Sequence, residues 1–115
     1  MPTSAIEALK DFGELEEVER FFKDPTVMKV ARFLYDLQKR LPDVPRKPED
    51  VITYRRISQS CGVDFGTLEK IFYQKRIGTM LFGIYQCIIN GRVYEGVELT
   101  AIAKDYLKES GLIKE

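Results

Sequence analysis

The stretch that most constrains the fold is TYRRISQSCGVDFGTLEKIFYQKR, residues 53–76. Gly62 follows a run compatible with a short helix, and glycine can adopt the positive φ that a tight corner needs. Two residues later, Asp64 supplies a side-chain acceptor for the free N–H groups that begin a second helix. Around this corner, apolar residues stand where two crossed helices would bury them: Ile57, Cys61, Val63, Leu68 and Ile71. The pattern predicts a helix-turn-helix, which can insert its second helix into a DNA major groove, although helical proteins that do not bind DNA also contain such corners.

A second informative feature is Asn90-Gly91, which lies between FGIYQCII and RVYEGVEL. Asn-Gly suits a two-residue type I′ turn, because both turn positions need φ > 0. A hairpin about this turn would pair Ile88 with Val93 and Ile84 with Val97 on one face, and Cys87 with Tyr94 and Tyr85 with Gly96 on the other. The alternative is that 77–89 is a helix that ends at Asn90-Gly91, because its apolar residues also have helical spacing.

Two helical regions precede the helix-turn-helix. Ser4-x-x-Glu7 has the form of a capping box, and apolar residues then recur every three or four positions as far as Phe22. Gly13 interrupts this run, which therefore predicts two short helices or one bent helix. Asp24-Pro25 predicts an N-cap and a first-turn proline for a helix over 26–40.

The remaining segments complete the predicted order of elements. Three prolines make 41–50 an extended connector that is too short to separate domains. Residues 100–109 are expected to form the last helix, closed by Gly111. The fold class predicted from the whole chain is mainly α with a small β-hairpin, that is α+β.

Length and composition exclude several classes of protein. A chain of 115 residues buries roughly two thirds of its unfolded surface as one domain. No apolar run approaches the roughly 20 residues that span a bilayer, and the first residues do not resemble an export signal, so we expect a cytoplasmic protein. The chain has no histidine and only two cysteines, which argues against a zinc site and histidine-dependent catalysis. We predict no enzyme activity, no metal and no cofactor.

The net charge is zero, but the charges are unevenly distributed. Residues 46–92 carry eight basic and four acidic side chains, whereas 1–45 and 93–115 each carry two more acidic than basic side chains. The positive excess thus coincides with the segment that would face DNA. Chance clustering on a solvated surface is the alternative.

The order helix, connector, helix-turn-helix, hairpin, helix resembles a winged helix-turn-helix. Three pieces are similar to the ArsR- and MarR-like transcription regulators of archaea and bacteria: DPTVMKVARFLYDL at 24–37, ISQSCGVDFGTLEKIF at 57–72 and GRVYEGVELT at 91–100. The resemblance covers about 24–109. It departs from the family in a longer segment between Ile71 and the wing, and in acidic Asp64 and Glu69 on the recognition helix. The family's metal-sensing cysteine pair is missing, so metal sensing is not implied.

The resemblance implies a DNA-binding transcriptional regulator whose recognition helix covers about 65–76, with a wing that turns at 90–91. Thr67 and Lys70 would lie nearest the bases, with Gln74, Lys75 and Arg76 nearer the phosphates. Arg55 and Arg56 would hold the DNA backbone, and Arg92 would reach the minor groove. The alternative is a winged-helix or helical protein-interaction module, a small subunit of a larger nucleoprotein or transcription assembly, in which Phe65, Phe72 and Tyr73 would serve an interface.

The chain is divided into an N-terminal helical segment, 1–23, and a winged helix-turn-helix domain, 24–115. We expect a homodimer, because one module reads one half-site and symmetric regulators pair two. The predicted interface joins the N-terminal and C-terminal helices through Ile6, Leu9, Phe12, Leu15, Tyr106 and Leu107. The alternative is that these residues pack on the core of their own chain.

Overall fold

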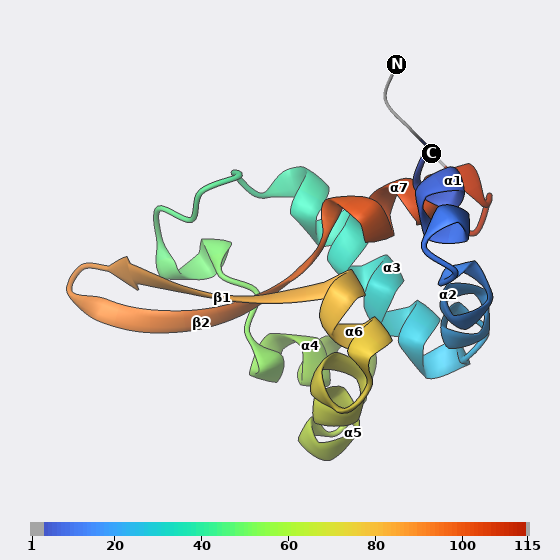
Figure 1. Cartoon of the computed structure of the whole chain (residues 1–115). Coiled ribbons are helices and arrows are strands. Elements are labelled where there is room, and N and C mark those ends of the chain that lie inside the picture. The colour runs from blue at the N-terminus through green and yellow to red at the C-terminus, as the bar shows by residue number, and fades with distance from the viewer. Residues whose placement is uncertain (1–3, 115) are drawn as a thin grey trace.

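The structure, a computed structural model, describes residues 4–114. Its elements follow the predicted order, and the predicted α+β class is confirmed (Figure 1). They are α1 (Ala5–Asp11), α2 (Leu15–Phe22), α3 (Pro25–Arg40), the 3-10 turn η1 (Pro48–Asp50), α4 (Tyr54–Cys61), α5 (Phe65–Glu69), the π-helical η2 (Lys70–Gln74), α6 (Arg76–Leu81), β1 (Phe82–Ile89), β2 (Arg92–Leu99) and α7 (Ala101–Glu109). No helix within residues 4–114 is both long enough and apolar enough to cross a membrane.

The N-terminal region forms two short helices rather than one bent helix. Gly13 has φ +72° and separates α1 from α2. The Ser4 hydroxyl accepts a hydrogen bond from the Glu7 N–H at 3.1 Å, so Ser4 is the predicted N-cap. The Asp24 carboxylate caps α3 in the same way, accepting from the Thr26 N–H at 2.8 Å. These local signals set where the helices begin.

The helix-turn-helix corner is confirmed at Gly62, which ends α4 with φ +67° and ψ +35°. This left-handed conformation lets the Gly62 N–H donate to the Ser58 carbonyl and turns the chain toward α5. Asp64 then caps α5, because its carboxylate accepts from the Thr67 N–H at 2.7 Å. Leu68 of α5 and Ile57 of α4 are fully buried. The corner therefore holds α5 at a fixed angle to α4.

The predicted recognition helix over 65–76 is wrong at its C-terminal end. The α-helical part stops at Glu69, a π-helical turn covers Lys70–Gln74, and Lys75 is extended with φ −115° and ψ 136°. A separate helix, α6, begins at Arg76. Gly78 of α6 packs directly on the backbone of Ile71, where an added Cβ would overlap the carbonyl oxygen. This close return places α6 directly against η2 before the chain enters β1.

The hairpin is confirmed in strand limits, turn and register. Asn90 and Gly91 have φ +52° and +78°, as a type I′ turn requires. The pairs Ile88–Val93, Ile84–Val97, Cys87–Tyr94 and Tyr85–Gly96 all lie opposite each other. Residues 76–81 are helical and 82–89 form a strand, which resolves the ambiguity of 77–89. The Val97 N–H donates to the Ile52 carbonyl at 2.9 Å, which fixes the base of the hairpin to the segment before α4.

A single core joins the N-terminal segment to the rest of the chain. Phe22 stacks on Tyr106 of α7 with ring centroids 5.6 Å apart, and Leu9 of α1 is 1% exposed. The Glu109 carboxylate at the end of α7 accepts from the Ala5 and Ile6 N–H groups of α1 at 2.9 and 3.1 Å. These hydrogen bonds lower the pKa of Glu109 and cap α1 from a different helix. Figure 1 shows α1 and α7 side by side at the end of the molecule opposite the hairpin.

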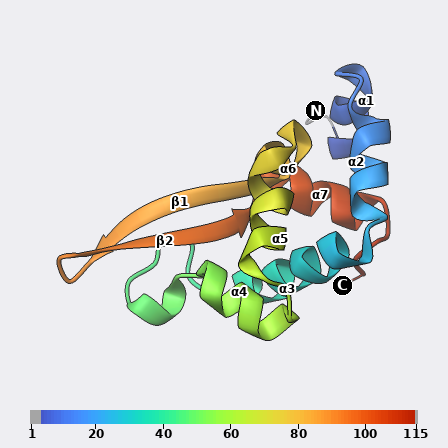
Figure 2. The same ribbon diagram turned by 90° about the horizontal axis from the view of Figure 1, so that it is seen from below.

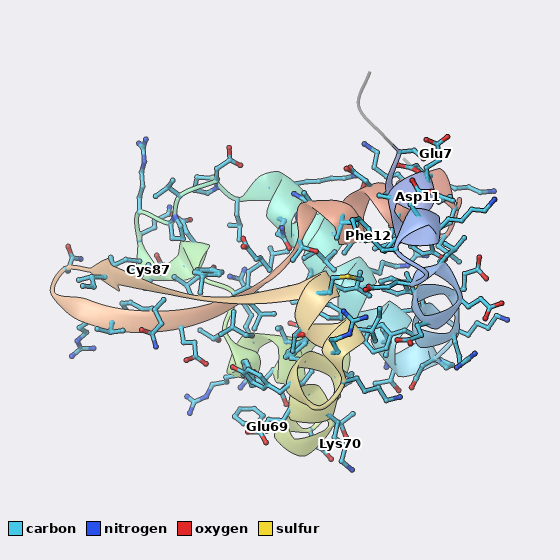
Figure 3. The ribbon with its side chains drawn as sticks, in the orientation of Figure 1. Glu7, Asp11, Phe12, Glu69, Lys70 and Cys87 are labelled. Carbon is cyan, nitrogen blue, oxygen red and sulfur yellow. The ribbon has the colours of Figure 1, made fainter. Side chains whose placement is uncertain are left out.

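The predicted dimer-interface residues are therefore revised. Leu9, Tyr106 and Leu107 are buried in the core of their own chain, so they form no outward surface. Ile6 and Leu15 are partly buried against the same core. Phe12 remains, 81% exposed at the end of α1 (Figure 3). These side chains are buried because α1 and α2 cover the apolar surface of α3 and α7.

Candidate nucleic-acid interface

α5 and the hairpin form one side of the molecule. Figure 2, which views the chain from below, shows α5 between the hairpin and the N-terminal helices, with α4 crossing beside it. The outer side of α5 and η2 exposes Phe65, Gly66, Glu69, Lys70 and Tyr73, while Leu68, Ile71 and Phe72 face the core. Figure 3 places Glu69 and Lys70 on this outer side. The outer side of α5 is therefore exposed and could contact a DNA groove or a flat surface of a partner protein.

Four of the predicted DNA-contacting cations are exposed and carry no ion pair within residues 4–114. They are Arg55 on α4, Lys70 and Lys75 at the end of the recognition segment, and Arg92 beside the hairpin turn. Unpaired exposed cations can approach phosphates without first breaking an internal contact. Thr67 is half-buried near the start of α5, with its N–H bonded to Asp64.

Two other predicted contacts are already engaged within the chain. The Arg56 guanidinium donates to the Glu49 carbonyl at 2.8 Å, which ties α4 to η1. The Arg76 guanidinium donates to Glu14 Oε1 at 2.7 Å, and this hydrogen bond followed by the carboxylate charge raises the pKa of Arg76. Because Arg76 opens α6 rather than closing the recognition helix, its assignment to DNA phosphates is not supported by the geometry. The Gln74 side chain lies outside the described part of the structure.

An aromatic cluster also occupies this face. Tyr54 of α4 meets Phe65 edge-on at 6.3 Å and Phe72 at 5.5 Å. Burial, followed by a contact with Tyr73, raises the pKa of Tyr54 above its ordinary value. Phe72 is 1% exposed and belongs to the core, whereas Phe65 and Tyr73 are about half exposed, at 51% and 50%. Tyr54 therefore supports two outward-facing rings on the recognition segment.

Acidic side chains offset part of the positive charge of this surface. Glu69 is exposed on α5, and Asp64 at its N-cap has a pKa lowered by its hydrogen bonds to Thr67. Glu95 on β2 is exposed and close enough to Tyr54 to raise the pKa of that phenol further. The surface is thus mixed in charge rather than strongly basic.

The hairpin carries a second apolar element that is not buried. Ile88 and Val93 lie opposite each other near the turn and are 73% and 65% exposed. Side chains two positions apart share a face of the hairpin, so Ile88 and Val93 lie on the same face as the buried pair Phe82–Leu99 and the pair of buried Val97 with partly buried Ile84. Arg92 follows the turn directly. A wing of this composition offers one cation and an apolar tip.

Sequence reasoning missed two features of the site. The Glu14–Arg76 contact joins residues far apart in the chain, and no local pattern predicts it. Thr67 and Lys70 also line a groove of about 630 Å³ whose other wall is α2. The spacing of Glu17, Arg20 and Phe21 on one side of α2 was visible in the sequence, but the approach of α2 to the recognition segment was not. Within residues 4–114, no group of three His, Cys, Asp or Glu side chains is placed to hold a metal ion.

Comparison of the chain with protein-family models, with curated proteins and with solved structures gave no match in any of the three.

Proposed function

We propose that this protein binds double-stranded DNA as a winged helix-turn-helix regulator of transcription, with a cytoplasmic location. The recognition segment, from α5 to the end of η2, would lie in the major groove, and the hairpin would reach along the DNA as the wing. The ArsR- and MarR-like resemblance belongs to this proposal.

One observation supports it most. The left-handed corner at Gly62 and the cap at Asp64 present an exposed α5, and the hairpin extends from the same side of the molecule. Unpaired Arg55, Lys70 and Arg92 are spread over the three elements that would meet DNA. Phosphate contacts from several elements fix the orientation of such a domain on the duplex.

The position of each residue in the fold suggests which part of the DNA it would contact. Thr67 and Lys70 would lie nearest the base edges, since they stand on the first turns of the recognition segment. Lys75 and Arg55 would contact phosphates, and Arg92 would enter the minor groove. Arg56 and Arg76 would contribute only after leaving Glu49 and Glu14, respectively.

Fluorescence anisotropy with a labelled random duplex tests the proposal. The double variant Arg55→Ala/Arg92→Ala should bind more weakly at low salt, and the slope of log K against log salt should fall by about two. The matched control is Lys10→Ala/Arg40→Ala, which removes the same charge from exposed positions on α1 and α3. Equal affinity and slope for the two double variants would contradict the assignment.

The exposed apolar groups favour one other function, a protein-interaction module in a nucleoprotein or transcription assembly. Phe65 and Tyr73 expose large apolar side chains on the recognition segment, which also carries acidic Glu69, and Ile88 and Val93 do so near the hairpin turn. This composition is closer to a protein interface than to a phosphate-binding surface. No retardation of random duplex at micromolar protein and low salt would favour this function over DNA binding.

We also propose a homodimer, now through the surface around Phe12. Deletion of residues 1–22 would not test the dimer cleanly, because Leu9, Val18 and Phe22 belong to the core of the chain. Phe12→Ser removes an 81% exposed ring and should leave the fold intact. Sedimentation should show a dimer that dissociates in this variant. A monomeric wild-type protein would contradict the dimer, and a Phe12→Ser dimer would place the interface elsewhere.

A further inference from the structure

The outer side of the recognition segment presents one row of exposed side chains. Phe65, Glu69 and Tyr73 follow one another at helical spacing, and Lys70 lies beside Glu69. Figure 3 shows Glu69 and Lys70 on the side that faces away from the core. Thr67 is half-buried and lies outside this row. The groups that extend furthest from the segment therefore include two, Phe65 and Glu69, that carry no positive charge.

Glu69 and Lys70 are a hydrogen-bond acceptor and a hydrogen-bond donor at adjacent positions. Neither has an ion pair with another residue of the described range 4–114, and adjacent side chains of a helix do not face each other. A carboxylate repels phosphates, so its favourable contact with DNA is with a base amino group. In the major groove, a C·G pair offers the cytosine N4 amino group to a carboxylate and the guanine O6 and N7 atoms to a lysine. One such pair therefore matches both side chains.

Phe65 supplies an apolar contact at the start of α5. Its ring meets Tyr54 edge-on, with centroids 6.3 Å apart, and this contact supports one side of the ring while 51% of the side chain stays exposed. The apolar group that DNA presents in the major groove is the C5 methyl of thymine. The step from Phe65 to Glu69 is about 6 Å along a helix axis, which is close to two base-pair steps of about 3.4 Å each.

We propose that Phe65, Glu69 and Lys70 determine the sequence specificity of the recognition segment, and that they select a thymine about two base pairs from a C·G pair. This inference rests on the proposed DNA binding. Phe65 contacts the thymine methyl group, Glu69 accepts from cytosine N4, and Lys70 donates to guanine. The exposed carboxylate lowers the affinity for phosphates in general, and it contributes selectivity by favouring duplexes that place a cytosine amino group against it.

Selection from a library of random-sequence duplexes, followed by sequencing, tests the hydrogen-bonding part of this assignment. The full-length wild-type protein should enrich a motif that contains the thymine and the C·G pair. Glu69→Gln should replace the cytosine by adenine in the enriched motif, because a glutamine amide forms two hydrogen bonds with adenine N6 and N7. Glu16→Gln is the matched control, since it removes the same charge from an exposed position on α2, and it should leave the motif unchanged.

Replacing the selected thymine by deoxyuridine tests the contact of Phe65, because this base lacks only the methyl group. Wild-type binding to the selected duplex should weaken about fourfold, as expected for the loss of one buried methyl group. Phe65→Ala should bind the two duplexes equally. Lys70→Ala should lose roughly tenfold of the preference for the selected duplex over one in which T·A replaces the C·G pair.

The possible outcomes distinguish the base assignments from DNA binding itself. Duplex binding without an enriched motif, or an unchanged motif for Glu69→Gln, would overturn the base assignments and leave DNA binding intact. So would an equal loss on deoxyuridine replacement in the wild type and in Phe65→Ala. Absence of any duplex binding by the wild type would overturn both. A motif that changes with Glu69→Gln but not with Glu16→Gln would support both.

Discussion

Gly78 gives the sharpest test of how the recognition segment ends. It is buried in α6, and an added Cβ would overlap the Ile71 carbonyl oxygen and lie 3.2 Å from the carbonyl carbon. Both obstructing atoms are backbone, so neither can move away by changing a rotamer. We therefore expect Gly78→Ala to push α6 away from η2.

Two opposing effects determine how much Gly78→Ala changes the free energy of unfolding. Overpacking a buried site costs about 1–3 kcal/mol, and a backbone obstruction belongs at the upper end of that range. The higher helix propensity of alanine offsets this cost by up to about 1 kcal/mol relative to glycine. We expect a net loss of about 2 kcal/mol in the free energy of unfolding, which lowers the melting temperature by on the order of 10 °C for a chain of this size.

Gly66→Ala is the matched control. Gly66 is also helical, but it is exposed, and an added Cβ would meet only Asp64 Oδ1 at 3.7 Å. This variant should be as stable as the wild type or slightly more stable. Thermal unfolding followed by circular dichroism compares the two. If Gly78→Ala melts as high as Gly66→Ala, the close packing of α6 on Ile71 is refuted.

Three other predictions use the same stability assay. Gly62→Ala should cost about 1 kcal/mol, because φ is +67° and nothing within 4 Å opposes the new methyl group; an unchanged melting temperature would argue against the left-handed corner. Arg76→Ala should lower stability, because Glu14 is 15% exposed and would lose its cation, and its affinity for duplex should change less than that of Arg55→Ala. Glu109→Gln should be less stable than wild type at pH 7. Since hydrogen bonds from the Ala5 and Ile6 N–H groups lower the folded-state pKa of Glu109, this difference is fully present above the unfolded pKa of about 4.3 and shrinks as the pH falls through the folded-state pKa. A difference that does not shrink as the pH is lowered would contradict it.

Local chemistry made much of the fold readable from the sequence. Asn90-Gly91 can form a type I′ turn at little conformational cost, and the side-chain alternation of its strands then leaves one register that buries Val97 and partly buries Ile84. Gly62 and Asp64 likewise specify a corner and a cap within three residues. Each of these signals acts between near neighbours, so it needs no knowledge of the rest of the chain.

The candidate site was only partly predictable. Arg55, Lys70, Lys75 and Arg92 are exposed as expected, because each stands beside a predicted corner, helix end or turn. Arg76 lies outside the recognition helix, although neither proline nor glycine stands between Lys70 and Arg76 in the sequence. The end of that helix depends instead on the π-helical turn and on the return of α6 over Ile71.

Backbone preferences and short-range hydrogen bonds fix where the chain turns, which residues cap its helices and which strands pair, so these features can be predicted from the sequence alone. Which apolar faces cover each other depends instead on packing between segments that are distant in the sequence. α1 and α2 carry apolar residues that could serve a partner or their own core, and periodicity is the same in both cases. Burial of Leu9 and Val18, the Glu109 cap on α1 and the Glu14–Arg76 pair resolve that choice through contacts between distant segments.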